Sequence, residues 1–138
     1  YEVLQPEYNL MARKGYETTL EPLIRQAQIG VVPYYALASG FLTGKYRSQA
    51  DLGKSATRAN TVGNYLNGYG LRVLAALDDI ARRHAATPAQ VALAWLIARP
   101  GISAPIAGAT SVAQVQELAG AVRLRLDDVD LARLNQGV

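Results

Sequence analysis

The feature that most limits how this chain can fold is an apolar run that ends abruptly in a turn of small and hydroxyl residues. Residues 29–32 are apolar and rich in β-branched side chains, which favours a strand buried on both faces. Residues 33–46 then introduce hydroxyl side chains together with Gly40 and Gly44. Backbone N–H groups and hydroxyls at such a turn can bind phosphate, although an ordinary turn has the same composition. The stretch therefore predicts a buried strand and leaves a structural and an anion-binding interpretation of its loop open.

A strand and a helix precede this buried run. Residues 2–5 are typical of the end of a strand that Pro6 terminates, and residues 18–28 carry apolar side chains at helical spacing. A third apolar run, residues 102–107, follows two further helical patterns. This alternation predicts an α/β fold with about three parallel strands. The other helices are expected at residues 71–84, 88–97, from 112 onward and 124–134, with N-caps at Thr87, Ser111 and Asp127.

The region from residue 47 to residue 68 differs from the rest of the chain. It is polar, rich in glycine, asparagine and serine, and shows no apolar period. A long irregular segment inside a compact domain is usually a lid or is disordered. We therefore expect a mobile lid loop over residues 47–68 within a single domain, residues 1–138, and Tyr46, Tyr65 and Tyr69 are candidates to line it.

The net charge and the absence of cysteine limit the classes of ligand and partner that this chain is expected to bind. The formal net charge of +3 has no block of like charges, which favours an anionic small ligand and provides no basic platform for nucleic acid. The chain has no cysteine, which excludes disulfides and cysteine-ligated metal and fits a cytoplasmic protein. No apolar run approaches the ~20 residues of a membrane span. The single histidine, His84, ends a predicted helix and is expected at the surface, so no metal site is expected either.

Four blocks of the sequence resemble aldo-keto reductases. Residues 33–46 are similar to the family's segment after its seventh strand, and residues 4–10 to its sixth strand. Residues 105–114 are similar to the eighth strand and the coenzyme-phosphate loop, and residues 87–95 form the fourth block. The resemblance implies the C-terminal part of a (β/α)8 TIM barrel. Since such a barrel needs about 200 residues at least, we expect an incomplete barrel, produced by truncation, by proteolysis or by partial representation of the parent chain.

The resemblance also implies an NADP(H)-dependent oxidoreductase that reduces a small-molecule carbonyl substrate, an aldehyde or ketone, to an alcohol. Gln5 would bind the nicotinamide carboxamide, and Tyr34 would stack on the nicotinamide ring. The turn after Tyr34 would run along the pyrophosphate, and the loop before the helix from residue 112 would hold the adenine end. The implied pyrophosphate contacts are Leu37, Ser39, Gly40, Thr43 and Lys45, and the implied contacts of the adenine and 2′-phosphate are Gly108, Thr110, Ser111, Gln114 and Glu117.

Three positions at the adenine end depart from the family's pattern. Gly108 stands where some members have lysine, Gln114 where many have arginine, and Leu118 where asparagine is frequent. A cation facing the 2′-phosphate is the usual basis for choosing NADP over NAD. We keep NADP as the expected coenzyme on the family's habit, with NAD as the other candidate.

Arg13 and Glu17 belong to a stretch that resembles another segment of the family, one that holds the loop after the first predicted strand in place. Arg13 and Glu17 lie four residues apart in that segment. We expect an ion pair between them, with a structural role.

No residue of this chain matches the family's catalytic group. In aldo-keto reductases a tyrosine donates the proton, assisted by aspartate, lysine and histidine, and these are expected before residue 1. We therefore expect no catalytic residue here, no activity of the chain alone, and a missing N-terminal half of the barrel as its partner. The alternative is a non-catalytic half-barrel that binds nucleotide or associates with itself through open strand edges.

Overall fold

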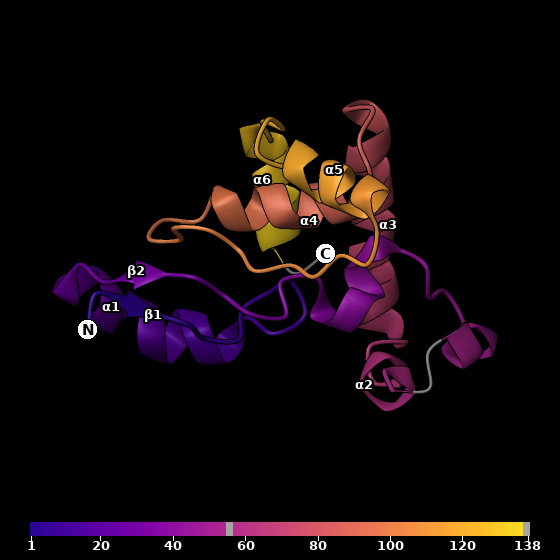
Figure 1. The fold of residues 1–138 in the computed structure, drawn as a ribbon, viewed down its shortest axis with the longest axis horizontal. Helices are drawn as coiled ribbons and strands as arrows, with labels where there is room; N and C mark the ends of the chain where they lie inside the picture. The colour runs from indigo at the N-terminus through magenta and orange to yellow at the C-terminus, as the bar shows by residue number, and fades with distance from the viewer. Residues whose placement is uncertain (55–56, 137–138) are drawn as a thin grey trace.

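The computed structural model describes residues 1–54 and 57–136. Its elements fall into two neighbouring groups (Figure 1). One group holds two short strands and the helix between them, and the other holds the longer helices that follow from residue 68 onward. The strands are β1 (Val3–Leu4) and β2 (Gly30–Val31).

The two strands are parallel, as the sequence predicts. Val3 pairs with Gly30 and Leu4 with Val31. The Gly30 N–H donates to the Glu2 carbonyl over 3.0 Å and the Val32 N–H donates to the Leu4 carbonyl over 2.9 Å. The pairing continues past both strands, because the Tyr34 N–H donates to the Pro6 carbonyl over 3.0 Å. The segments that follow the two strands therefore leave the sheet side by side.

The predicted third strand, residues 102–107, is reduced to a single parallel bridge between Val31 and Ile102. The Ser103 N–H donates to the Val31 carbonyl over 2.8 Å, and the Ile106 N–H donates to the Pro33 carbonyl over 2.9 Å. Between these bonds Pro105 has no N–H to donate, which interrupts the ladder. The prediction of about three parallel strands is therefore confirmed for two, and the third is an extended segment that lies beside β2 with one parallel bridge.

The predicted helix at residues 18–28 begins earlier and changes type. Tyr16–Leu20 forms a π-helical turn, η1, and continues directly into α1 (Glu21–Ala27), which has proline in its first turn. Gln28 ends the helix in the left-handed conformation, with φ of 53°. That single residue turns the chain from α1 into β2.

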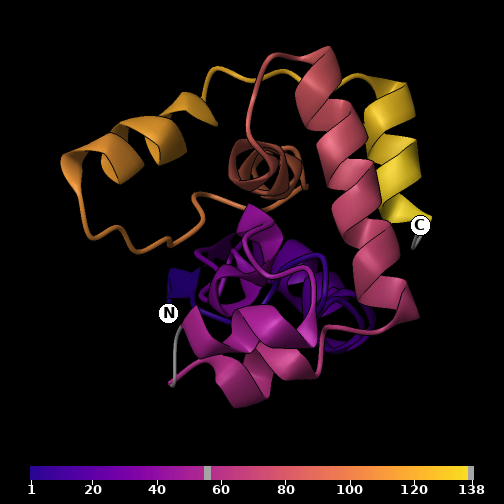
Figure 2. The same cartoon turned by 90° about the vertical axis from the view of Figure 1, so that its right-hand side faces the viewer.

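The four longer helices form one group with α4 at its centre. They are α3 (Gly68–Arg83), α4 (Pro88–Ile97), α5 (Val112–Gly120) and α6 (Asp128–Asn135). Figure 2 looks along α4, with α3 and α6 on one side and α5 on the other. The side chains of α4 are apolar around most of its circumference and are buried, with Trp95 fully enclosed. A helix of this kind needs neighbours on every side, which explains its central place.

The segment of residues 47–68 is not the irregular loop that its composition predicts. It contains a 3₁₀ helix, η3 (Gln49–Lys54), and a short helix, α2 (Ala59–Gly63). Val62 of α2 is completely buried, and Tyr46, which was expected to line the lid, is 1% exposed in the core. Ser55 and Ala56 belong to the predicted lid and lie outside the described residues.

His84 does end α3 as expected, but it is not a free surface residue. Its Nε2 lies 2.7 Å from Oδ2 of Asp130 in α6, and its side chain is 23% exposed. The carboxylate of Asp130 is completely buried and also pairs with Arg83. These contacts join α3 to α6 on the side away from α5.

Candidate functional site

A groove of about 690 Å³ lies where the segments that follow the strands meet α5 and the 47–68 segment. One wall is the turn that follows β2, and the other is formed by residues 106–110 and by Gln114, Glu117 and Leu118 of α5. Thr57, Arg58 and Thr61 approach from the 47–68 segment, and Ala89 comes from α4. Ligand sites of parallel α/β folds lie beyond the carboxyl ends of the strands. This groove is therefore the candidate functional site.

The groove brings together most of the residues that the sequence singled out. Hydrogen bonding between Ile106 and Pro33 holds the two distant segments side by side. Gln5 and Ser111 are the exceptions: Gln5 is exposed just after β1, and Ser111 is the N-cap of α5. The predicted residues that line the groove are Tyr34, Leu37, Ser39, Gly40, Thr43, Lys45, Gly108, Thr110, Gln114 and Glu117.

The turn after β2 has an unusual backbone. Tyr35, Ala38 and Ser39 have φ of 52°, 49° and 57°, a left-handed conformation that residues with a Cβ adopt at a cost. The Ala38 N–H closes the turn by donating to the Tyr35 carbonyl over 2.7 Å. Strained backbone of this kind concentrates at ligand-binding sites. It also turns consecutive peptide groups in different directions, which is how short turns present N–H groups to anions.

The positively charged ends of the Lys45 and Arg58 side chains both lie beside Gly40. A Cβ built on Gly40 would lie 3.3 Å from Nη1 of Arg58 and 3.5 Å from Nζ of Lys45. With φ of 92°, Gly40 also occupies a conformation that favours glycine. The bare backbone and the two positive charges together suit a phosphate group.

Arg58 was missed by the sequence analysis. It lies in the polar 47–68 segment, where no period or motif distinguishes one charged residue from another. Its positive charge was the only available signal, and local sequence does not show which charges fold back over a groove. The tertiary structure supplies this information.

The Thr43 hydroxyl is already used as a donor. Its Oγ1 donates to the Gly40 carbonyl over 2.7 Å, across the turn. In this arrangement the hydroxyl stabilises the turn around Gly40 and has no second proton for a ligand. Its predicted phosphate contact would require an exchange of partners.

The opposite end of the groove is polar but carries no lining cation among the described residues. The N–H and the hydroxyl of Thr110 both donate to Oε1 of Gln114, over 2.7 Å and 3.1 Å. The Ser111 hydroxyl accepts from the Gln114 N–H over 3.2 Å, which caps α5. The cap at Ser111 lacks the return bond of a capping box, because Oε1 of Gln114 accepts from Thr110. Glu117 supplies a negative charge at this end.

Tyr34 presents part of its ring to the groove. Its side chain is 37% exposed, and its ring lies edge-on to Tyr35, with centroids 5.0 Å apart. Its backbone is held by the bond to Pro6 described above. A ring held at its backbone and open on one face can stack on a planar ligand.

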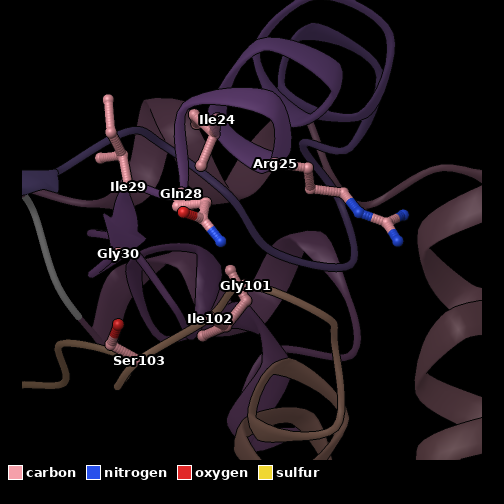
Figure 3. Close-up of a pocket in the computed structure, with 8 residues that line it drawn as sticks. All are labelled: Ile24, Arg25, Gln28, Ile29, Gly30, Gly101, Ile102 and Ser103. Atoms are coloured by element: carbon pink, nitrogen blue, oxygen red, sulfur yellow. The ribbon is translucent and has the colours of Figure 1, made fainter.

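A second hollow, of about 430 Å³, lies at the opposite ends of the strands (Figure 3). It is bordered by the end of α1, by Gly30 and by the segment that begins at Gly101. It contains none of the predicted ligand contacts. In parallel barrels the amino ends of the strands serve stability, and this hollow is not the candidate site.

The described residues, 1–54 and 57–136, contain no group of three or more histidine, cysteine or acidic side chains placed to hold a metal ion. None of the helices formed by these residues has the length and apolar character that crossing a membrane requires.

Comparison with protein families matches nearly the whole chain. The model of the aldo/keto reductase family aligns with residues 2–137. This chain belongs to the aldo/keto reductase family. The (β/α)8 barrel is the fold of this family, and the two parallel strands with their helices are a fragment of such an α/β arrangement.

Individual relatives agree with the family match. This aldo/keto reductase chain is 40% identical over 119 residues to a protein named probable voltage-gated potassium channel subunit beta from Arabidopsis thaliana. It is 31% identical over 136 residues to probable aldo-keto reductase 1 from Glycine max. It is 32% identical over 117 residues to aldo-keto reductase yakc [NADP(+)] from Schizosaccharomyces pombe.

The matches cover most of this aldo/keto reductase chain but a minor part of each relative. They include 83%, 98% and 81% of the chain, against 36%, 39% and 34% of the respective relatives. The chain thus spans little more than a third of the length of the proteins it resembles. The groove described above remains the candidate functional site of this chain.

Proposed function

We propose that this chain supplies the coenzyme-binding half of an NADP(H)-dependent reductase that converts aldehydes or ketones to alcohols. The observation that carries the proposal is the convergence of Lys45 and Arg58 on Gly40 in a groove lined by the predicted coenzyme contacts. The printed name of the Schizosaccharomyces pombe relative, which includes NADP(+), supports the choice of coenzyme.

The groove fits a dinucleotide in size and chemistry. Its volume of about 690 Å³ falls within the usual range of ligand pockets. Lys45 and Arg58 would neutralise the pyrophosphate, and the bare backbone at Gly40 would let it approach closely. Tyr34 would stack on the nicotinamide ring and shield one of its faces from water.

Bound NADPH would supply the hydride that reduces the carbonyl carbon of the substrate. The chain's own contribution is to bind and orient the coenzyme through the groove and to exclude water beside Tyr34. The proton that the carbonyl oxygen needs comes from a group outside this chain, since none of its residues matches the family's proton donor.

A non-catalytic half-barrel that binds nucleotide or associates with itself is the second candidate. The observation in its favour is the exposed edge of β1, where the side chains of Val3 and Leu4 are 56% and 37% exposed. An unpaired edge of this kind can pair with a further strand.

The test is an NADPH titration of the full-length protein and of its Arg58→Ala variant. Removing the guanidinium beside Gly40 is expected to weaken NADPH binding roughly tenfold, as the loss of one charge-assisted contact would. Arg125→Ala is the control, because Arg125 donates to the Val122 carbonyl outside the groove. Equal affinity of Arg58→Ala and the parent protein would contradict the assignment of the groove.

NADPH consumption with a generic aldehyde separates the two candidate functions. Oxidation of NADPH by the full-length protein supports the reductase. Binding without oxidation for any aldehyde or ketone in a broad panel supports the half-barrel, and absence of NADPH binding rejects both nucleotide-dependent proposals.

A further inference from the structure

Asn9 is a fully buried polar residue that lies outside the groove and contacts its wall. It follows β1 and is 0% exposed. Its Oδ1 accepts from the Met11 N–H over 2.8 Å and from the Ala12 N–H over 2.9 Å. Its Nδ2 donates to the Tyr35 carbonyl over 2.9 Å, across 26 positions of sequence. Backbone N–H groups only donate and a carbonyl only accepts. The oxygen of the Asn9 amide must therefore face the Met11 and Ala12 N–H groups, and its nitrogen must face the Tyr35 carbonyl.

The oxygen and the nitrogen of the Asn9 side-chain amide have different roles. The bonds to Met11 and Ala12 are local, and an aspartate or serine oxygen at position 9 could accept them equally well. The bond to Tyr35 needs a donor that reaches beyond the local turn. Among the usual turn residues, asparagine provides both functions at once.

The hydrogen bond from Asn9 is made to Tyr35, the first residue with a left-handed backbone in the turn after β2. Tyr35 has φ of 52°, and its carbonyl also accepts from the Ala38 N–H over 2.7 Å. These two donors fill both lone pairs of that carbonyl and hold the Tyr35 peptide in the left-handed conformation. Leu37, Ser39 and Gly40, which line the groove, follow directly from this peptide.

We propose that Asn9 is a positioning residue for the coenzyme groove, whose side-chain amide holds the Tyr35 peptide so that the turn presents its backbone to the dinucleotide. The proposal rests on the proposed function of the groove. Asn9 does not itself line the groove, and it acts through the carbonyl of Tyr35, which does.

The test is a double-mutant cycle in the full-length protein, with NADPH affinity as the readout. Asn9→Ser keeps an acceptor for the local turn, is too short to reach the Tyr35 carbonyl, and should weaken NADPH binding roughly tenfold. Tyr35→Gly relieves the strain, because glycine adopts positive φ readily. In that background Asn9→Ser should weaken binding only about twofold, since the turn no longer depends on the bond from Asn9.

The matched control is Asn135→Ala. It removes the hydrogen bond that Trp95 donates to Oδ1 of Asn135 over 2.9 Å, away from the groove. We expect this variant to lose stability and to keep the parent's NADPH affinity. If Asn9→Ser fails to fold, Asn9→Asp replaces it in the cycle, because aspartate keeps the shape and the local acceptors and lacks the donor.

The outcomes distinguish a failure of the positioning role of Asn9 from a failure of the proposed function of the groove. NADPH binding by the parent protein with unchanged affinity in Asn9→Ser would overturn the positioning role and leave the proposed function standing. Equal effects of Asn9→Ser with and without Tyr35→Gly would overturn it as well. Absence of NADPH binding by the parent protein would reject both proposals.

Discussion

Arg13 links the beginning of the chain to its end. The predicted ion pair is present, with Nε of Arg13 2.8 Å from Oε1 of Glu17. The same guanidinium donates to the Leu134 and Asn135 carbonyls at the end of α6, over 3.2 Å and 2.8 Å, and lies over the Trp95 ring. The sequence indicated the local pair. The contacts with α6, more than a hundred positions away, follow from packing around Trp95.

Glu17 is the acceptor at the centre of this cluster. Burial raises the pKa of Glu17, but hydrogen bonds from Arg13 and Tyr8 and the charges of Arg13 and Arg99 outweigh burial and lower the pKa below its usual value. A carboxylate whose pKa is lower in the folded state stabilises the fold above its unfolded pKa, about 4.3 for glutamate. That contribution is lost as the pH falls through the lower, folded value.

We therefore predict that Glu17→Gln lowers the free energy of unfolding by about 1–2 kcal/mol at neutral pH. Below pH of about 4 the difference from the parent protein should shrink, because the parent's own glutamate becomes protonated there. Urea unfolding of the full-length protein at both pH values measures this. Glu2→Gln, at an exposed position before β1, is the control, and a pH-independent difference for Glu17→Gln would contradict the argument.

The three predicted N-caps are confirmed, although α3 begins at Gly68 instead of residue 71 and α6 at Asp128 instead of residue 124. Thr87, Ser111 and Asp127 each accept a hydrogen bond from the third residue of the helix that follows, as predicted. N-caps depend on a side chain and a backbone group three positions apart, so a short stretch of sequence suffices to recognise them. The π-helical turn η1 and the helices within residues 47–68 lacked any such local signal.

The 47–68 segment is held in place by its packing against α3 and η2 (Ala38–Thr43). Its Tyr65 ring packs on Phe41 of η2, with centroids 5.5 Å apart, and its last residues lead into α3. Gly70 lies at this junction, where a Cβ would overlap the Tyr65 carbonyl and lie 3.1 Å from Phe41 Cζ. The backbone of the 47–68 segment therefore reaches α3 only because position 70 has no side chain.

Gly70→Ala is predicted to destabilise the full-length protein by about 1–3 kcal/mol, the usual cost of overpacking. It should also weaken NADPH binding, because displacement of the segment carries Arg58 away from Gly40. Thermal unfolding and NADPH titration measure the two effects. Gly53→Ala is the matched control in the same segment, since a Cβ there meets nothing within 4 Å. Unchanged stability of Gly70→Ala would refute this account of the junction.

At the scale of the whole molecule, one side of the sheet is left uncovered by the rest of the chain. Val3 and Leu4 of β1, and Ile106 beyond β2, are exposed. Apolar strand residues seldom stay uncovered, and the chain spans well under half of the length of its relatives. We propose that the remainder of the barrel covers this side in the full-length protein.

A polypeptide of residues 1–138 alone is accordingly predicted to self-associate with rising concentration, as followed by sedimentation velocity. Val3→Lys should reduce the association, because a charge on an edge strand opposes strand pairing. Val129→Lys, at a similarly exposed valine on α6, should leave it unchanged. A monomer at all concentrations, or equal effects of the two substitutions, would disprove association through β1.

Features that depend on short stretches of the chain could be predicted from the amino-acid sequence alone. These are the parallel pair of strands, the N-caps, the buried character of α4, and the two segments that line the groove. Backbone hydrogen bonding and side-chain periodicity act over a few residues, which makes such features readable without a structure.

Features that depend on residues far apart in the chain became visible only in the folded molecule. Tertiary packing reduced the third strand to a bridge at Ile102, placed Arg58 beside Gly40, joined His84 to Asp130 and connected Asn9 to the Tyr35 carbonyl. Each of these contacts exists because packing brings together groups that have no local reason to meet. The periodicity of a sequence describes which face of an element is buried, and only the assembled core determines what that face, and the polar residues around it, will touch.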